Sequence, residues 1–210
     1  MHRAARQPLW RPGLLDGQVV AVAGRVGGTG RAAAAACGDL GAHVEQLGDE
    51  GHRVDLGDED AVQSAISRIA APEHRLDTVV IDAAGVFAAG PSPEEALRAA
   101  TTAAWVVARA AATRVMIDAE GGKLVVLAPP VDAGRHSGAV RAGLENLART
   151  LSIEWSRYRI RTTTIAPGPG SRAADIAALV VYLASPAGDY FSGCVFSLDG
   201  TRPQVADPDG

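Results

Sequence analysis

A cluster of glycines has the clearest chemical meaning in this chain. Gly24, Gly28 and Gly30 follow a short apolar run at residues 19–23 and lead into an alanine-rich stretch at residues 29–40. A glycine-rich turn between a strand and a helix lets the backbone approach a diphosphate, and the helix start supplies unpaired N–H groups and positive potential. The spacing therefore predicts a phosphate-binding turn. A tight strand-to-helix turn without a ligand is the alternative interpretation.

Three neighbouring polar residues form a second, weaker candidate site. His136, Ser137 and Arg141 lie at the start of a predicted helix, and the last two are four residues apart on one helical face. An imidazole or a hydroxyl can move a proton, whereas an arginine stays protonated and supplies only a fixed positive charge. The same trio is typical of a helix start with a solvated, ion-pairing face, so both interpretations stay open.

The scarcity of lysine excludes one catalytic pair. Lys123 is the single lysine of the chain, and none of the three tyrosines has a lysine four residues after it. A Tyr-x-x-x-Lys pair is therefore impossible.

Length and composition indicate one domain. The chain has 210 residues, 47% of them hydrophobic, and no break in composition, which suits a single α/β domain with a full core. A net charge of −4 without a basic face gives no electrostatic footprint for nucleic acid. No segment approaches 18 uninterrupted apolar residues. We expect a cytoplasmic protein with no nucleic-acid or membrane partner, and a domain at residues 14–201 between flexible tails at 1–13 and 202–210.

The two cysteines do not indicate a metal site. Cys37 and Cys194 lie far apart, without Cys-x-x-Cys spacing or a nearby histidine pattern. The sequence thus predicts neither a zinc site nor a disulfide framework, and both cysteines are expected to be small core residues.

Strands and helices are predicted to alternate along the chain. Apolar runs predict strands at residues 19–23, 42–47, 53–56, 78–81, 123–127, 160–165 and 194–198. Helical periodicity and capping residues predict helices at residues 29–40, 59–69, 93–117, 138–157 and 174–184. Such alternation predicts right-handed crossovers and an α/β fold, with a doubly wound Rossmann-type parallel sheet of about seven strands and helices on both faces.

Several further motifs occur in a characteristic order. After the glycine turn come Asp55, Ala83-Ala84-Gly85, Ala142-Gly143-Leu144, Ala166-Pro167-Gly168 and Leu198-Asp199-Gly200. With the glycine spacing G-x-x-x-G-x-G, this order resembles that of the short-chain dehydrogenase/reductases, from about residue 16 to residue 201. The resemblance implies a Rossmann-type oxidoreductase that binds NAD or NADP.

The resemblance also implies which residues hold the cofactor. It places three glycines at the pyrophosphate, an aspartate at the adenine and a glycine in the adenosine pocket: Gly24, Gly28, Gly30, Asp55 and Gly85. The residue that ends the second strand would choose between NAD and NADP. That residue is Gly48 or Asp49, because the sequence leaves the register open.

The catalytic set of the family is not matched. The family's Tyr and Lys positions correspond to Ser137 and Arg141, its Ser position to Pro129 or Ala128, and its Asn position to a residue near Ala100. A serine hydroxyl lacks the acidity of a tyrosine, whose pKa is about 10, and an arginine cannot relay a proton. We therefore expect ordinary NAD(P)-dependent carbonyl reduction to be disfavoured.

Three functional hypotheses follow. The preferred one is a catalytically degenerate family member, a non-catalytic or regulatory subunit that pairs with itself or with an active paralogue through the helices around residues 97–117 and 138–157. The second is an oxidoreductase or a non-redox enzyme with a displaced site, in which Ser137, His136 or Arg141 acts on a small molecule. The third is a sensor module that binds NAD(P) without turning it over.

Overall fold

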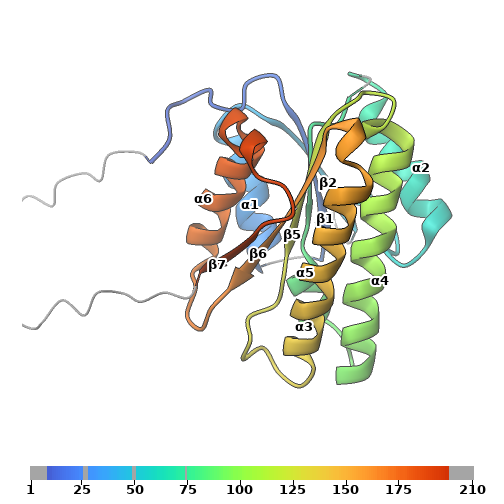
Figure 1. Cartoon of the computed structure of the whole chain (residues 1–210), viewed down its shortest axis with the longest axis vertical. Coiled ribbons are helices and arrows are strands. Elements are labelled where there is room, and N and C mark those ends of the chain that lie inside the picture. Colours follow the sequence, from blue (N-terminus) through green and yellow to red (C-terminus); the bar gives the residue numbers. More distant parts are fainter. Residues whose placement is uncertain (1–8, 26–27, 49–50, 74, 199–210) are drawn as a thin grey trace, which may run out of the picture.

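A seven-stranded parallel sheet forms the centre of the molecule (Figure 1). The computed structural model describes residues 9–25, 28–48, 51–73 and 75–198. In spatial order the strands run β3-β2-β1-β4-β5-β6-β7. Their bounds are β1 Val19–Gly24, β2 His43–Gly48, β3 His52–Arg53, β4 Thr78–Ile81, β5 Gly122–Leu127, β6 Ile160–Pro167 and β7 Val195–Leu198. The predicted doubly wound fold is confirmed.

Helices cover both faces of the sheet. Figure 1 shows α1 and α6 on one face and α2, α4 and α5 on the other. The helices are α1 Gly28–Gly38, α2 Glu59–Ala70, α3 Ala83–Ala88, α4 Pro93–Ala111, α5 Ser137–Glu154 and α6 Ala173–Ala184. A π-helical turn and two 3-10 turns complete them: η1 Ala112–Met116, η2 Ser156–Tyr158 and η3 Pro186–Tyr190. No described helix has the length and apolarity needed to cross a membrane.

Strand β4 shows why helices cover both faces of the sheet. All four of its residues are buried. Val79 and Ile81 join the core beneath α2, α4 and α5, whereas Val80 joins the core beneath α1 and α6. Successive side chains of a strand point to opposite faces, so an unbroken apolar run needs a helical layer on each side.

Two predicted elements differ from the structure in extent. The third strand was expected over residues 53–56, but β3 ends at Arg53. Beyond it the Asp55 carboxylate accepts the Gly57 N–H at 2.9 Å, a side-chain contact that turns the chain toward α2. The expected helix at residues 93–117 is α4 followed by the wider turn η1, and the expected helix at 138–157 is α5 followed by η2.

The amino-terminal region makes contacts before the expected domain boundary at residue 14. The Trp10 ring stacks on Tyr182 of α6, with ring centroids 6.0 Å apart. Leu15 is fully buried beside the same helix layer. Residues 1–8 and 199–210, which include the predicted carboxyl-terminal tail at 202–210, lie outside the described residues.

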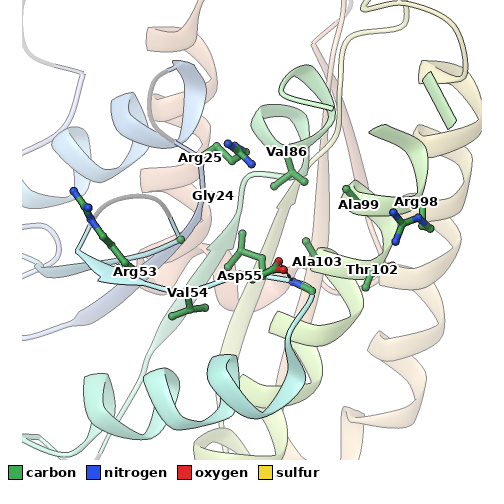
Figure 2. Close-up of a pocket in the computed structure, with 13 residues that line it drawn as sticks. Gly24, Arg25, Arg53, Val54, Asp55, Val86, Arg98, Ala99, Thr102 and Ala103 are labelled. Atoms are coloured by element: carbon green, nitrogen blue, oxygen red, sulfur yellow. Dashed lines mark hydrogen bonds between the residues drawn. The ribbon is translucent and has the colours of Figure 1, made fainter. Parts of the chain in front are cut away.

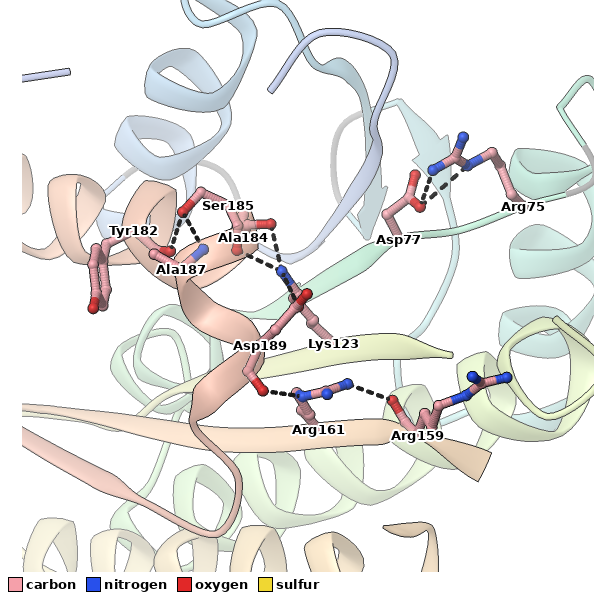
Figure 3. A network of polar contacts seen from close by, with 10 residues as sticks. All are labelled: Arg75, Asp77, Lys123, Arg159, Arg161, Tyr182, Ala184, Ser185, Ala187 and Asp189. Carbon is pink, nitrogen blue, oxygen red and sulfur yellow. Dashed lines mark hydrogen bonds and ion pairs between the residues drawn. The ribbon is translucent and has the colours of Figure 1, made fainter. Parts of the chain in front are cut away.

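The single lysine forms hydrogen bonds between the sheet, at the amino ends of the strands, and the end of α6 (Figure 3). Lys123 is the second residue of β5, and its Nζ donates to the Ala184 carbonyl at 2.8 Å and the Ser185 carbonyl at 2.6 Å. The same ammonium pairs with Asp189 at 2.9 Å. Lys123 thus binds the end of α6 and the start of η3, at the edge of the sheet opposite the glycine turn.

The cysteines differ in exposure. Cys37 is buried in α1, and this burial raises the pKa of its thiol to about 12. Cys194 is only half-buried. Only the first is therefore the core residue that was expected.

Candidate functional site

The strand order reverses direction between β1 and β4, and the glycine turn lies at that point. From β1 the chain passes through α1 to β2 on one side, and later returns to β4 on the other side. Helices that leave two neighbouring strands in opposite directions open a crevice at the carboxyl ends of the strands. Gly24 ends β1, and Asp82 directly follows β4.

Asp82 is the polar residue at the centre of this crevice. Its side chain is fully buried. One carboxylate oxygen, Oδ2, accepts the Gly30 N–H at 2.8 Å, and the other, Oδ1, accepts the Gly85 N–H at 2.9 Å. Burial raises the pKa of Asp82, and these two hydrogen bonds oppose the rise.

Three of the five predicted cofactor residues pack around this carboxylate. A Cβ atom added to Gly24, Gly30 or Gly85 would lie 2.8, 2.6 or 2.8 Å from the nearest Asp82 side-chain atom. Close approach to Asp82 therefore explains the absence of a side chain at these positions. Gly28 is different, because its φ of +63° favours glycine and no heavy atom of another described residue is found within 4 Å of its Cβ position. Gly28 faces open space.

A cavity of about 830 Å³ borders the glycine turn (Figure 2). Gly24 and Asp55, two of the predicted cofactor residues, line the cavity. Gly85 is not part of the lining, to which α3 contributes Val86 instead. The lining comes from β1, the ends of β2 and β3, α3 and α4: Gly24, Arg25, Gly48, Arg53, Val54, Asp55, Leu56, Gly57, Val86, Arg98, Ala99, Thr102 and Ala103. Three of these residues are arginines and one is an aspartate, so the cavity suits an anionic ligand of nucleotide size.

The register of the second strand is now defined. Gly48 is the last residue of β2 and pairs with Gly24 of β1. A Cβ atom at Gly48 would lie 2.0 Å from the Gly24 carbonyl oxygen, and the φ of Gly48 is +129°. Only glycine fits there. Asp49, the other candidate for the residue that chooses between NAD and NADP, lies outside the described residues.

The sequence spacing predicts that Ser137 and Arg141 lie on one face of a helix, but their side chains bind to different parts of the structure. The Ser137 residue is buried, and its hydroxyl donates to the Val131 carbonyl at 2.6 Å, which ties the preceding loop to α5. The Arg141 guanidinium reaches the carboxyl ends of two strands. Its Nη1 donates to the Pro167 carbonyl at 2.5 Å and to the Pro129 carbonyl at 3.3 Å.

His136 turns toward a different helix. Its backbone is left-handed, with φ of +71°, and its Nε2 lies 3.4 Å from Glu94 Oε1 at the start of α4. The Glu94 N–H and this imidazole lower the pKa of Glu94. The three candidates therefore do not form one catalytic trio, because Ser137 is sealed by its loop and His136 bonds to α4.

Sequence reasoning missed three residues of the site. Arg53 and Arg98 line the cavity, and Asp82 holds the Gly30 N–H in the glycine turn beside it. Arg98 belongs to a helix whose position depends on the strand order, and Asp82 bonds to a residue 52 positions away. The Asp-Ala-Ala-Gly run at the end of a strand could have indicated a helix start with Asp82 as its cap, because aspartate is a preferred N-cap residue.

A family model described as enoyl-(acyl carrier protein) reductase matches residues 24–174. The chain belongs to the short-chain dehydrogenase/reductase family. The solved structure of a citronellol catabolism dehydrogenase from Pseudomonas aeruginosa PAO1 is 29% identical, with a TM-score of 0.77 over 92% of this chain and 98% of that chain. A short-chain type dehydrogenase/reductase from Mycobacterium ulcerans, 21% identical with a TM-score of 0.74 over 89% of this chain and 90% of that chain, shares the fold.

Relatives in sequence are named as reductases of this family. A probable 2,4-dienoyl-CoA reductase of Bacillus subtilis (strain 168) is 26% identical over 245 aligned positions, which cover 89% of this chain and 96% of the relative. The mouse peroxisomal 2,4-dienoyl-CoA reductase is 32% identical over 93 positions, 31% of this chain and 32% of the relative. An alignment of 245 positions exceeds the 210 residues of this chain, so the bacterial relative carries segments that this short-chain dehydrogenase/reductase lacks.

The expectation of a non-catalytic subunit is wrong. The Bacillus subtilis relative and the Pseudomonas aeruginosa structure, which each match most of the chain, are named as a reductase and a dehydrogenase. The expectation treated the unmatched Ser, Tyr, Lys and Asn positions, and above all the missing Tyr-x-x-x-Lys pair, as the loss of the whole reaction. That pair serves proton transfer, and proton transfer is only one part of a reduction.

Proposed function

We propose that the chain is a dinucleotide-dependent oxidoreductase that reduces a carbon–carbon double bond conjugated to a carbonyl, such as that of an enoyl thioester. One observation carries the proposal. The Arg141 guanidinium is fixed at the carboxyl ends of β5 and β6 by the Pro129 and Pro167 carbonyls, while the neighbouring Ser137 hydroxyl is buried and already donates to Val131. The site therefore offers a fixed cation at the positions that the sequence resemblance assigns to the family's Tyr and Lys.

The residues around the glycine turn fit the dinucleotide. Gly24 and Asp55 line the cavity of about 830 Å³, and Gly28 leaves open space beside the first turn of α1. The N–H groups of Gly30 and Gly85 both donate to Asp82, and these two hydrogen bonds hold the glycine turn against the end of β4. Three arginines against one aspartate favour the dinucleotide with the additional ribose phosphate, NADP(H), over NAD(H). When bound, the dinucleotide supplies a hydride to the substrate.

A fixed cation suits the reduction of a conjugated double bond. After hydride reaches the β-carbon, negative charge collects on the thioester oxygen as an enolate, and the α-carbon later takes a proton from water. The described residues accept two of the five N–H donors of Arg141, and the others remain for that oxygen. A preorganised donor aimed at developing charge contributes roughly 10²- to 10³-fold in rate. Reduction of a ketone would instead require a proton donor at the alkoxide, which neither Arg141 nor the buried Ser137 hydroxyl provides.

Substrate tests with two variants decide the proposal. The wild type is expected to oxidise NADPH with an enoyl or dienoyl thioester of coenzyme A and not with simple ketones. Arg141→Ala should lower kcat/KM by about 100-fold or more. Ser137→Ala should stay within about three-fold of the wild type, because the loop contact is not part of the chemistry. A wild type that reduces ketones but not thioesters, or an Arg141→Ala variant with unchanged kcat/KM, would refute the proposal.

A further inference from the structure

One carboxylate joins the starts of two helices beneath the glycine turn. Asp82 Oδ2 accepts the N–H of Gly30 in the first turn of α1, and Asp82 Oδ1 accepts the N–H of Gly85 in α3. The Asp82 N–H itself donates to the Ala23 carbonyl at 2.7 Å, which anchors the residue to β1. Asp82 thus connects α1 with β1 and α3, and the last two elements contribute residues to the lining of the cavity.

The packing around this carboxylate leaves it little freedom. Asp82 is fully buried, and Gly24, Gly30 and Gly85 approach it so closely that a methyl group on any of them would collide with it. The two hydrogen bonds and the three close glycine backbones together hold the Asp82 side chain in one conformation. The location of Gly30, and with it the first turn of α1, is therefore set by the end of β4.

The two hydrogen bonds also require a carboxylate rather than an amide. Two N–H donors approach two different oxygens of Asp82. An asparagine offers one acceptor oxygen, and its NH₂ group would face the second N–H, so one of the two helix starts would lose its partner. A buried donor without a partner is costly, and the local backbone relaxes to satisfy it.

We propose that Asp82 is a positioning residue for the diphosphate of the dinucleotide, because it holds the first turn of α1 and Gly24 in the arrangement that presents the turn to the phosphates. This inference rests on the proposed dinucleotide-dependent function. Asp82 does not touch the ligand in this role. It acts through the backbone of Gly24 and Gly30, while the base and ribose are held by the cavity around Asp55.

The test separates the diphosphate from the rest of the ligand. Calorimetric titrations of the full chain compare NADPH with adenosine 2′-monophosphate, which has the base, the ribose and the ribose phosphate but no diphosphate. Asp82→Asn is expected to weaken NADPH binding by about ten-fold, although it removes a negative charge, and to leave adenosine 2′-monophosphate within about three-fold. A residue that merely stabilises the fold would not produce this split.

Strand β4 offers a matched control. Asp77, at the amino end of the same strand, accepts the Val19 N–H at 2.8 Å through its carboxylate. Asp77→Asn therefore makes the same chemical change far from the glycine turn, and both ligands should bind within about three-fold of the wild type. If Asp82→Asn does not fold, Gly85→Ala provides the second variant. Its new methyl group would press on Asp82 Oδ2 from the α3 side, and it should show the same split.

Each outcome bears on the inference. NADPH binding that is unchanged or tighter in Asp82→Asn would overturn it, as would an equal loss for both ligands. Wild-type protein that binds neither NADPH nor NADH would overturn the proposed function and the role of Asp82 together. Wild-type binding with the predicted split supports both.

Discussion

Asp82 makes the stability of the fold depend on pH. Burial raises the pKa of this carboxyl group, so the folded protein keeps its proton to a higher pH than the unfolded chain, in which aspartates titrate near about 3.9. Its contribution to stability is fully present below the unfolded pKa, and it is lost as the pH rises through the raised folded pKa. We expect the wild type to lose free energy of unfolding relative to Asp82→Asn as the pH rises above about 4, the ordinary pKa of an aspartate. Urea denaturation at several pH values measures it, and a constant difference would contradict the expectation.

Arg98 tests the electrostatics of the cavity. It lines the cavity from α4, and Figure 2 shows it on the side opposite Arg53. If the cavity holds the ribose phosphate, Arg98→Ala should weaken NADPH by about ten-fold and NADH by less, because a guanidinium–phosphate contact is a charge-assisted hydrogen bond. Fluorescence titration with both dinucleotides measures the two changes.

Arg109 is the matched control for Arg98, because it lies on the same helix but pairs with Glu59 of α2 outside the cavity. Arg109→Ala should leave both affinities unchanged. Equal weakening of NADPH and NADH by Arg98→Ala would argue against a ribose phosphate in this cavity.

Among the elements, the C-terminal end of α6 receives hydrogen bonds from a side chain of β5, that of Lys123. Helix carbonyls at a C-terminus lack partners within the helix, and Lys123 supplies donors to two carbonyls there, those of Ala184 and Ser185. Lys123 is largely buried, with 14% of its side chain exposed. Lys123→Met should therefore lower the free energy of unfolding by about 2 kcal/mol.

Urea denaturation of Lys123→Met and Arg159→Gln measures this difference. Arg159 pairs with Glu120 at the same edge of the sheet, but both side chains are more than half exposed. Solvent screens such a pair, so the Arg159→Gln change should cost less than about 1 kcal/mol. Equal losses in the two variants would show that the buried contacts of Lys123 do not stabilise the end of α6.

One helix that the sequence analysis did not predict is α3. This segment, Ala83–Ala88, is short and apolar and shows no helical periodicity. The helix forms because Asp82 caps it, and Asp82 is held in place by Gly30 of α1. A cap that depends on a partner far along the chain is not visible in a local pattern. The strand at residues 78–81, in contrast, was predicted correctly because its apolar run is local.

For the whole molecule, we propose that two copies associate through the outer faces of α4 and α5. The two helices pack side by side, with the Cβ position of Gly143 4.0 Å from a methyl group of Thr101. Two large apolar side chains are exposed on them, Trp105 at 42% and Ile153 at 70%. Exposed aromatic and aliphatic anchors on a helical face are typical of symmetric interfaces.

Light scattering measures the association of the full chain. The wild type is expected to have the mass of a dimer or a larger assembly, and Ile153→Glu should shift it toward the monomer. Tyr190→Ser is the control, because Tyr190 is 88% exposed and belongs to η3 rather than to α4 or α5. A monomeric wild type would contradict the proposed interface.

The sequence by itself determined the order of strands and helices, the doubly wound class of the fold, and the absence of a Tyr-x-x-x-Lys pair. Apolar runs, helical periodicity and caps are local properties, and they survive folding because burial follows them. Tertiary structure alone decided that Asp82 fills the space beside three of the predicted cofactor glycines, that Arg53 and Arg98 line the cavity, and that Ser137 is sealed while Arg141 reaches two strand ends. These contacts join residues on different elements, and their partners are set by the strand order, which no local pattern contains.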